Sequence, residues 1–370
     1  MRELRDIAAR ADALRQRGDA FAVATVVRVD GSAFRREGAR MLIEADGRAT
    51  GAVSGGCLEG EVIEQARAAL ADGAGRLVSY RLGAEDPMLD AVLGFGSGCD
   101  GTVWLLIEPV SSGASGLGPL AATAVLGGRQ SGTLATVFAA DAPGLVGRRR
   151  LALGADVRSE LPAELDAAVE AAGAVERATV VRAEGAEVLV EPLRPPVHLA
   201  VFGHGPDAVP LVRLAAELGW TTTLAGSRPR SELEERFPQA DRHTVLTHPE
   251  DVFGRVLVDR QTAAVVLTHV YLQDRALLRE LLASDAFYVG ALGSRGRAAR
   301  LRADLADAGL DADAIARLRS PVGLDLGAET PAEIALAVTA EVLAVHRQRS
   351  ARPMVEAVRP ADAACSVVSH

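Results

Sequence analysis

The sequence contains no lysine, and all 40 of its basic residues are arginines. This absence excludes chemistry that needs a lysine amine, such as a Schiff base or the phosphate-binding lysine of a P-loop. Only three cysteines are present, too few for a disulfide scaffold, and an odd number fits a reducing cytoplasm. No stretch reaches the roughly 18 uncharged apolar residues that cross a bilayer, and the first residues lack the apolar segment of a signal peptide. We therefore expect a cytoplasmic protein that does not bind a membrane.

Aromatic residues are scarce, at 4%, whereas glycine is abundant, with 37 residues. The cores must then be built from alanine, valine and leucine, as in α/β proteins. The net charge is −9, because 49 acidic residues outnumber the arginines, and this argues against nucleic acid as a partner. At 370 residues the chain is long enough for about two domains, each with its own core.

A proline-rich run, Pro-Leu-Arg-Pro-Pro, marks the domain boundary, since proline stiffens the chain and ends strands. We place a mixed α/β domain at residues 1–192, interrupted by a Ser/Gly-rich break at 111–119, and a linker at 193–197. In residues 198–349, predicted strands alternate with predicted helices, a pattern typical of a parallel sheet with crossover helices. This segment is predicted to be a Rossmann-like domain, and residues 350–370 a flexible tail.

Gly203 and Gly205 lie in the run Gly-His-Gly-Pro-Asp-Ala, which follows a predicted strand and opens a predicted helix. Such glycines let the backbone approach a pyrophosphate, which the helix N-terminus then holds. The acidic residue expected about 20 positions later is missing. Arg228 or Arg230 stands there instead and could meet a 2′-phosphate, which favours NADP over NAD if either binds. The alternative is a Rossmann-like domain that binds no dinucleotide.

Cys57 ends the run Ser54-Gly55-Gly56-Cys57, where a strand and a glycine turn lead into a helix. A thiol at a helix N-terminus is stabilised as thiolate by the helix dipole and by free backbone N–H groups. The alternative is a buried, inert cysteine. Cys99 lies in a second glycine-flanked loop, and its separation from Cys57 matches no zinc spacing.

Two further places could hold an anionic ligand. His269 ends a predicted strand, where open α/β sheets place ligands, although a histidine there can also be purely structural. Gly293, Ser294 and Arg295 form another strand-to-helix turn, for which the alternative is a solvated helix face.

Several strings together resemble the XdhC/CoxI family, the accessory proteins that mature xanthine dehydrogenase and related molybdenum hydroxylases. In the first half the strings are Gly-Ser-x-x-Arg-x-x-Gly-Ala-x-Met at 31–41, Gly-x-x-Ser-Gly-Gly-Cys-Leu-Glu at 51–59 and Gly-Cys-Asp-Gly at 98–101. In the second half they are Thr-His at 268–269, the segment 288–295, and the run that starts Pro-Val-Gly-Leu-Asp at 321–335. The resemblance extends to about residue 346. The chain differs from the family pattern at Phe34, at Gly226-Ser227 and at Val270.

The resemblance implies a cofactor chaperone rather than a turnover enzyme. Such a protein binds the molybdenum cofactor, as molybdopterin or its cytosine dinucleotide form, and protects it while a cysteine desulfurase replaces an oxo ligand by sulfur. It then delivers the cofactor to the apo molybdenum hydroxylase large subunit, and we expect it to act as a homodimer. Carried over to this chain, Cys57 is the catalytic and metal-binding thiol, with Ser54, Gly55 and Gly56 as its loop and Cys99 nearby. The alternative is an NAD(P)-dependent oxidoreductase that uses the Rossmann domain.

Overall fold

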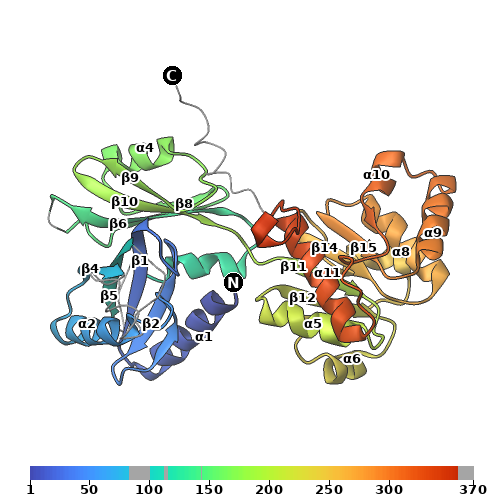
Figure 1. Ribbon diagram of the computed structural model, residues 1–370, viewed down its shortest axis with the longest axis horizontal. Helices are drawn as coiled ribbons and strands as arrows, with labels where there is room; N and C mark the ends of the chain where they lie inside the picture. The colour runs from blue at the N-terminus through green and yellow to red at the C-terminus, as the bar shows by residue number, and fades with distance from the viewer. Residues whose placement is uncertain (83–100, 112–115, 143, 357–370) are drawn as a thin grey trace. The chain divides into compact units, whose positions relative to one another are not determined.

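The computed structural model describes residues 1–82, 101–111, 116–142 and 144–356. The chain forms two compact units, one over Met1–Pro196 and one from Val197 onward (Figure 1). Within the described ranges, no helix combines the length and the apolar character needed to cross a membrane.

The first sheet of unit 1 is antiparallel throughout, with the strand order β3-β2-β1-β5-β4. Because side chains alternate along a strand, β1 packs against helix α2 through one face and against helix α1 through the other. The bounds of these elements are α1 Arg2–Arg17, β1 Phe21–Gly31, β2 Arg40–Glu44, β3 Ala49–Gly51, α2 Glu59–Asp72, β4 Arg76–Leu82 and β5 Gly101–Val110.

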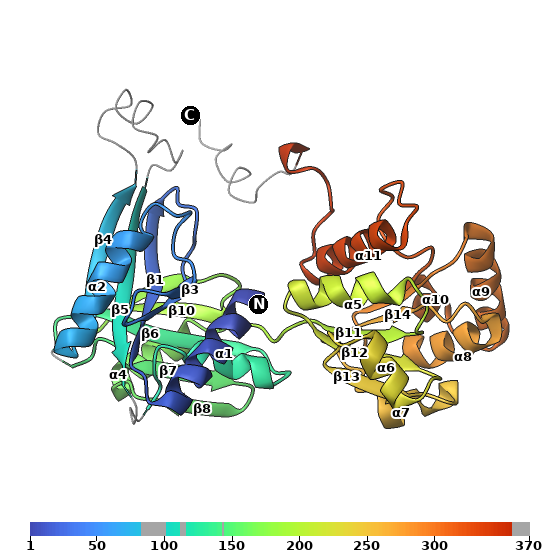
Figure 2. The same ribbon diagram turned by 90° about the horizontal axis from the view of Figure 1, so that it is seen from below.

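The second sheet of unit 1 is also antiparallel, in the order β8-β7-β6-β10-β9. Helix α4 covers one face, and Phe138 and Leu189 on the other face pack against Val27 and Leu106 of the first sheet. Figure 1 shows the two sheets stacked between α2 and α4, and Figure 2 shows α2 in front of the first sheet. The bounds are η1 Ala121–Gly127, β6 Gly132–Ala140, β7 Arg149–Leu153, β8 Asp156–Ser159, α4 Ala163–Ala171, β9 Thr179–Ala183 and β10 Ala186–Leu193.

Buried ion pairs also join the two sheets. Arg40 of β2 donates to both carboxylate oxygens of Glu191 on β10, at 3.0 and 2.7 Å, and both side chains are less than a tenth exposed. Arg149 of β7 donates to one carboxylate oxygen of Glu108 on β5. A buried guanidinium needs such a partner, because an unpaired buried charge is very costly.

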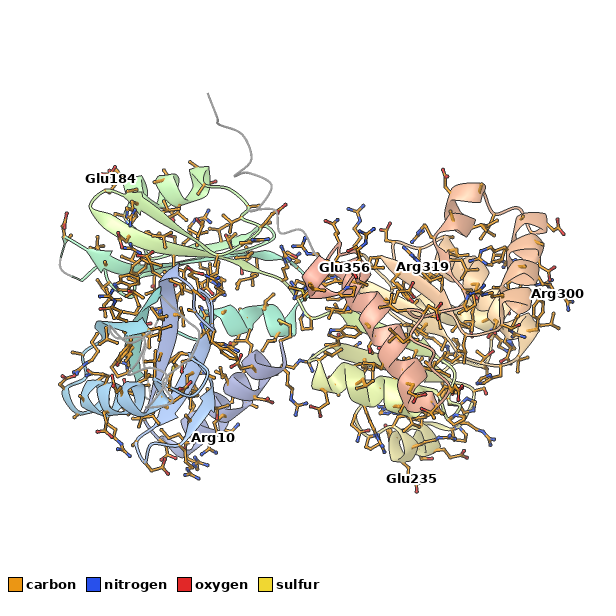
Figure 3. All side chains as sticks on the ribbon, viewed as in Figure 1. Arg10, Glu184, Glu235, Arg300, Arg319 and Glu356 are labelled. Atoms are coloured by element: carbon orange, nitrogen blue, oxygen red, sulfur yellow. The ribbon has the colours of Figure 1, made fainter. Side chains whose placement is uncertain are left out.

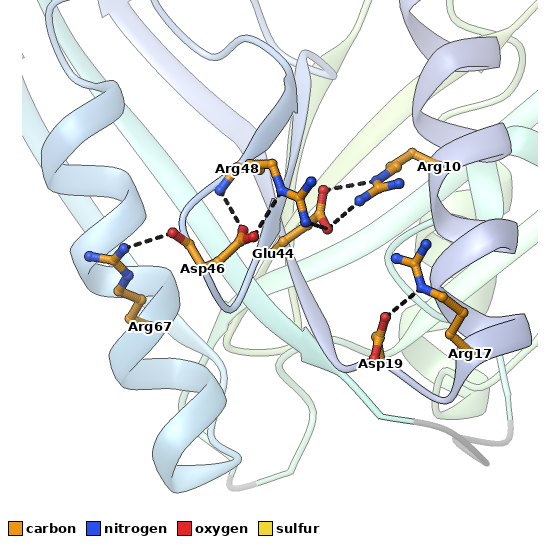
Figure 4. Close-up of polar contacts among 7 residues, drawn as sticks. All are labelled: Arg10, Arg17, Asp19, Glu44, Asp46, Arg48 and Arg67. Carbon is orange, nitrogen blue, oxygen red and sulfur yellow. Dashed lines mark hydrogen bonds and ion pairs between the residues drawn. The ribbon is translucent and has the colours of Figure 1, made fainter.

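Arginines also fix the hairpin between β2 and β3 (Figure 4). Arg10 of α1, which Figure 3 labels, donates to both carboxylate oxygens of Glu44 at 2.8 and 2.5 Å. The backbone N–H and the side chain of Arg48 both donate to the Asp46 carboxylate, and Arg67 of α2 donates to the Asp46 carbonyl oxygen at 3.1 Å. The contact between Arg67 and Asp46 ties α2 to this hairpin.

Unit 2 contains a single parallel sheet in the order β13-β12-β11-β14-β15-β16. Numbered within the unit, this is the order 3-2-1-4-5-6 of dinucleotide-binding Rossmann folds, and it confirms the predicted parallel sheet. Helices α5 and α11 cover one face, and α8 and α9 the other. The strands are β11 His198–Phe202, β12 Thr221–Gly226, β13 Arg242–Val245, β14 Thr262–Val266, β15 Tyr288–Ala291 and β16 Leu318–Arg319. The helices are α5 Ala208–Glu217, α6 Arg230–Arg236, η2 Pro249–Asp251, α7 Val252–Arg255, α8 Tyr271–Leu282, α9 Arg295–Asp307, α10 Ala312–Ala316, α11 Pro331–His346 and η3 Met354–Glu356.

Candidate functional sites

Cys57 lies at the surface of unit 1, directly before Leu58, the N-cap residue of α2. Its side chain is exposed and its thiol is free. Gly56, which precedes it, has a φ of +111°, a conformation that favours glycine. An added Cβ at Gly56 would meet no neighbouring atom, so the backbone conformation is the reason for glycine at this position. The structure therefore presents the sulfur to solvent, in contrast to the buried, inert alternative.

Ser54 and Glu59 hold this loop in place. The buried Ser54 hydroxyl donates to Glu59 Oε2 at 2.5 Å and accepts from the backbone N–H groups of Gly56 and Leu58 at 3.1 and 3.2 Å. The Glu59 carboxylate also accepts from the backbone N–H groups of Ser54 and Leu58, at 3.1 and 3.2 Å. The loop conformation is thus set by side chains on either side of Cys57, while the cysteine itself stays free.

A second loop lies against the Cys57 loop. The Phe34 ring stands over Gly55, where an added Cβ would lie 3.3 Å from the ring. Glu3 of α1 pairs with Arg35 and accepts from the Ala52 backbone N–H at 2.8 Å, which ties α1 to both loops. The fold therefore brings the strings at 31–41 and 51–59 side by side.

The last residue of the third N-terminal string, which covers residues 98–101, also lies beside the loop that contains Ser32. Gly101 begins β5 and lies so close to Ser32 that an added Cβ would be 2.7 Å from the Ser32 carbonyl oxygen. Cys99 lies outside the described residues. Among the residues that are described, no group of three or more histidine, cysteine or acidic side chains is arranged to hold a metal ion.

The second candidate site lies in unit 2, where the loops after β11, β12 and β14 meet. A pocket with a volume of about 390 Å³ is lined by His204, Gly205, Arg228, Glu232, Leu233, Arg236, Thr268 and His269. Three residues predicted from the sequence, Gly205, Arg228 and His269, thus share one pocket at the crossover point of the sheet, where Rossmann folds bind ligands. Arg230 lies elsewhere, in a different surface depression, and pairs with Glu234 at 2.7 Å.

His269 and Asp207 face each other at this pocket. The His269 Nε2 atom lies 3.2 Å from Asp207 Oδ2, and the His269 backbone has a φ of +61°, which few non-glycine residues adopt. Burial, followed by the charges of Arg228 and Arg236, holds the pKa of His204 below its ordinary value of 6.5, with Glu232 acting in the opposite direction. The pocket therefore contains two arginines within electrostatic reach of a histidine.

Gly293, Ser294 and Arg295 form the N-terminal turn of α9, as expected, and Ser294 caps the helix by accepting from the Arg297 backbone N–H. The structure links this turn to the loop of His269 through Asp274 of α8, which is only 1% exposed. Asp274 accepts from the Thr268 hydroxyl at 2.5 Å and from Arg297 at 2.6 Å. Arg295 does not line the pocket.

Sequence reasoning missed Asp207, Asp274, His204, Glu232 and Arg236. Asp207 lies within the glycine run that the sequence singled out. Its place at the start of a helix could have indicated that a carboxylate occupies the position where an anionic ligand is expected to bind. His204 lies in the same glycine run, and Glu232 lies four residues after Arg228, so both were also visible in the sequence. Asp274 meets Arg297 of α9, and Arg236 shares the pocket with His204 and His269, only through the fold.

The chain is similar to two family models. The XdhC Rossmann domain matches residues 199–342, and the XdhC and CoxI family model matches residues 14–81, so that together they cover more than half of the chain. The second match includes Cys57 and both of its neighbouring loops.

Related proteins and a solved structure match over nearly the whole length. A protein from Bacillus subtilis (strain 168) that is described as a probable xanthine dehydrogenase subunit is 28% identical over 339 residues, covering 91% of this chain and 96% of that protein. The molybdenum cofactor insertion chaperone PaoD from Escherichia coli (strain K12) is 27% identical over 329 residues, covering 89% and 84%. A crystal structure of a xanthine dehydrogenase from Bacillus halodurans superposes with a TM-score of 0.74 at 28% identity and covers 98% of this chain and 99% of its own.

Proposed function

The chain belongs to the XdhC and CoxI family, and from that premise we propose that it is an accessory protein that binds the molybdenum cofactor and delivers it to a molybdenum hydroxylase. A relative that covers most of the chain is named a molybdenum cofactor insertion chaperone, and another is named as part of a xanthine dehydrogenase. Both names support a role in maturing a xanthine dehydrogenase-type enzyme.

The observation that carries the proposal is the exposed Cys57 on a loop that is held from both sides. A thiolate is a soft ligand suited to metal–sulfur chemistry. Because Ser54 and Glu59 fix the loop, a cargo that contacts the sulfur does not have to order the backbone first, which lowers the entropic cost of binding. Among the described residues Cys57 is not part of a cluster of metal ligands, so in this proposal it contributes a single thiolate.

The finer parts of the proposal concern the partners. We propose that the cofactor stays bound while a cysteine desulfurase exchanges an oxo ligand for sulfur, and that the apo large subunit of the hydroxylase then receives it. We also propose that the protein acts as a homodimer.

The test is the molybdenum and pterin content of the protein purified from a molybdenum-replete host. We expect wild-type protein to retain both, Cys57→Ala to lose both, and Cys57→Ser to lose most of the molybdenum. Cys365→Ala, which removes a different cysteine, is the matched control and should retain both. Because Cys57 is exposed, its replacement leaves the fold intact, which circular dichroism checks.

Two results would contradict the proposal. Wild-type protein without pterin would refute cofactor binding altogether. A Cys57→Ala variant that carries as much molybdenum and activates a co-expressed xanthine dehydrogenase as well as wild type would remove Cys57 from the site.

A further inference from the structure

We infer that the pocket at the crossover point of the unit 2 sheet binds a phosphate monoester, and that it excludes the diphosphate of a nicotinamide dinucleotide. The inference concerns unit 2 alone and does not depend on cofactor binding at Cys57.

The positive charge of the pocket comes from Arg228, in the loop after β12, and from Arg236, at the end of α6. Arg228 has one distant carboxylate partner, Glu232 at 3.8 Å. No ion pair to Arg236 occurs among the described residues, and its guanidinium lies over the Phe237 ring at 5.8 Å. Arginine binds phosphate through planar, charge-assisted hydrogen bonds, so these two side chains are suited to a small anion.

His204 lines the same pocket as the two arginines. The charges of both arginines contribute to the lowering of its pKa. Both groups therefore act on one point of the pocket, although they come from different places on the chain. Among the side chains that line the pocket, the two arginines face one carboxylate, Glu232, while Asp207, which is not part of the lining, faces His269.

His269 and Asp207 make the place where a dinucleotide diphosphate would lie unfavourable for that group. In dinucleotide-binding Rossmann folds the diphosphate approaches the second glycine and the N-terminus of the following helix. Here an added Cβ at Gly205 would lie 3.2 Å from His269 Nε2, so the imidazole stands over that glycine. Asp207, the N-cap residue of α5, brings a carboxylate to the helix N-terminus, and Pro206 has no backbone N–H to offer.

The ribose end of a dinucleotide is not accommodated either. Gly226, the last residue of β12, and Ser227 stand where a carboxylate would accept the ribose hydroxyls. The carboxylate that lines the pocket, Glu232 of α6, lies 3.8 Å from Arg228, which precedes the helix. The volume of about 390 Å³ lies at the lower end of small-molecule sites. The pocket therefore lacks the contacts by which a Rossmann fold holds the diphosphate and ribose of NAD, which disfavours the oxidoreductase alternative.

The experiment is isothermal titration calorimetry of the full chain with inorganic phosphate, AMP, CMP, pyrophosphate, NAD and NADP. We expect inorganic phosphate, AMP and CMP to bind, and pyrophosphate and NAD to bind at least about tenfold more weakly. NADP also carries a phosphate monoester on its ribose 2′-oxygen, so we expect it to bind more tightly than NAD. The nucleotides also separate two sources of the monoester. Equal affinity for AMP, CMP and phosphate points to recognition of the phosphate alone, and a preference for one nucleotide points to a nucleoside subsite.

Matched variants test which residues form the site. Arg228→Ala/Arg236→Ala should weaken monoester binding by about tenfold or more, whereas Arg242→Ala/Arg279→Ala, which also removes two exposed positive charges but none from the pocket, should leave it unchanged. Asp207→Ser/His269→Ala should gain pyrophosphate binding. The inference is overturned if wild-type protein binds NAD or pyrophosphate more tightly than AMP, if no phosphate compound binds, or if both arginine double variants behave alike. A Cys57→Ala variant should bind phosphate like wild type, so a failure at Cys57 is distinguishable from a failure here.

Discussion

Replacing Ser54 by alanine tests whether one buried hydroxyl holds the loop that carries Cys57. Ser54 is 5% exposed, and its hydroxyl takes part in three hydrogen bonds, one donated to Glu59 and two accepted from the backbone N–H groups of Gly56 and Leu58. Alanine removes all three without adding any atom that could clash.

The expected cost follows from what remains in the variant. Gly56 is exposed, so its N–H group returns to water, and the Leu58 N–H group keeps Glu59 as its acceptor at 3.2 Å. The Glu59 carboxylate loses the hydroxyl but keeps the backbone N–H groups of Ser54 and Leu58. The net loss is mainly one hydrogen bond to a charged group, so we expect the free energy of unfolding of unit 1 to fall by about 2 kcal/mol. This is less than the roughly 3–5 kcal/mol of a charge left unpaired in the interior.

Urea unfolding followed by tryptophan fluorescence measures this cost. The chain has two tryptophans, Trp104 in β5 of unit 1 and Trp220 in unit 2. In a Trp220→Phe background the fluorescence reports unit 1 alone. Cys57→Ser in that background should change the free energy of unfolding by less than about 0.5 kcal/mol, because the side chain is exposed. An unchanged free energy in Ser54→Ala would refute the role of the hydroxyl, and an equal loss in Cys57→Ser would show that the sulfur itself is structural.

Three further predictions concern unit 2. Asp274→Ala should lower its free energy of unfolding by about 3–5 kcal/mol, because it leaves Arg297 without its carboxylate and Thr268 without its acceptor; Trp220 fluorescence measures this, and a loss below about 1 kcal/mol would contradict it. Gly203→Ala should prevent or strongly destabilise folding of unit 2, since the new Cβ would lie 2.5 Å from the Leu267 carbonyl oxygen. Gly205→Ala should be tolerated, because its new Cβ meets only the His269 ring, which can move. Equal melting temperatures for the two variants would contradict this prediction. Sulfate affinity should rise as the pH falls from about 8 to about 5.5. Sulfate keeps its charge over this range, while His204, whose pKa is held below 6.5, takes up a proton and adds a cation beside Arg228 and Arg236. The other charged or titratable groups at the pocket are Glu232, His269 and Asp207, which faces His269. Titration calorimetry at each pH checks this, His269→Gln isolates the share of the second histidine, and a His204→Gln variant with the full pH dependence would exclude His204.

The parallel sheet of unit 2 was predictable because its central strands are continuous apolar runs. Strands β11 and β14 are buried along their whole length, and helices follow them at regular intervals. The antiparallel sheets of unit 1 were less visible. The sequence indicated a mixed α/β domain, which is confirmed, but not its division into two sheets. Their contact uses buried charges such as Arg40 and Glu191, which resemble solvent-exposed residues until the fold pairs them.

The Cys57 loop was predictable in its location but not in its support. Glycines before a helix-initiating cysteine indicate an open turn, and the structure has one. Glu59 looked like an ordinary acidic residue in the first turn of a helix. Its carboxylate instead turns back to the Ser54 and Leu58 N–H groups, a contact that depends on the path of the loop and not on any spacing in the sequence. The role of Cys57 and its loop in cofactor binding stays a prediction.

The two glycines of the Rossmann loop show why a motif identifies a fold more securely than it identifies a ligand. In sequence, Gly203 and Gly205 look like equal parts of a pyrophosphate signature. In the structure, Gly203 is required by the adjacent strand, because the chain leaving β11 passes directly against Leu267 at the end of β14. That requirement follows from the strand order and would exist with no ligand at all. Gly205 faces the imidazole of His269, which lies next to the space where a side chain at position 205 would be. Both glycines are therefore accounted for by contacts within unit 2, and the charge that remains for a ligand lies at Arg228 and Arg236, beside the motif and outside it.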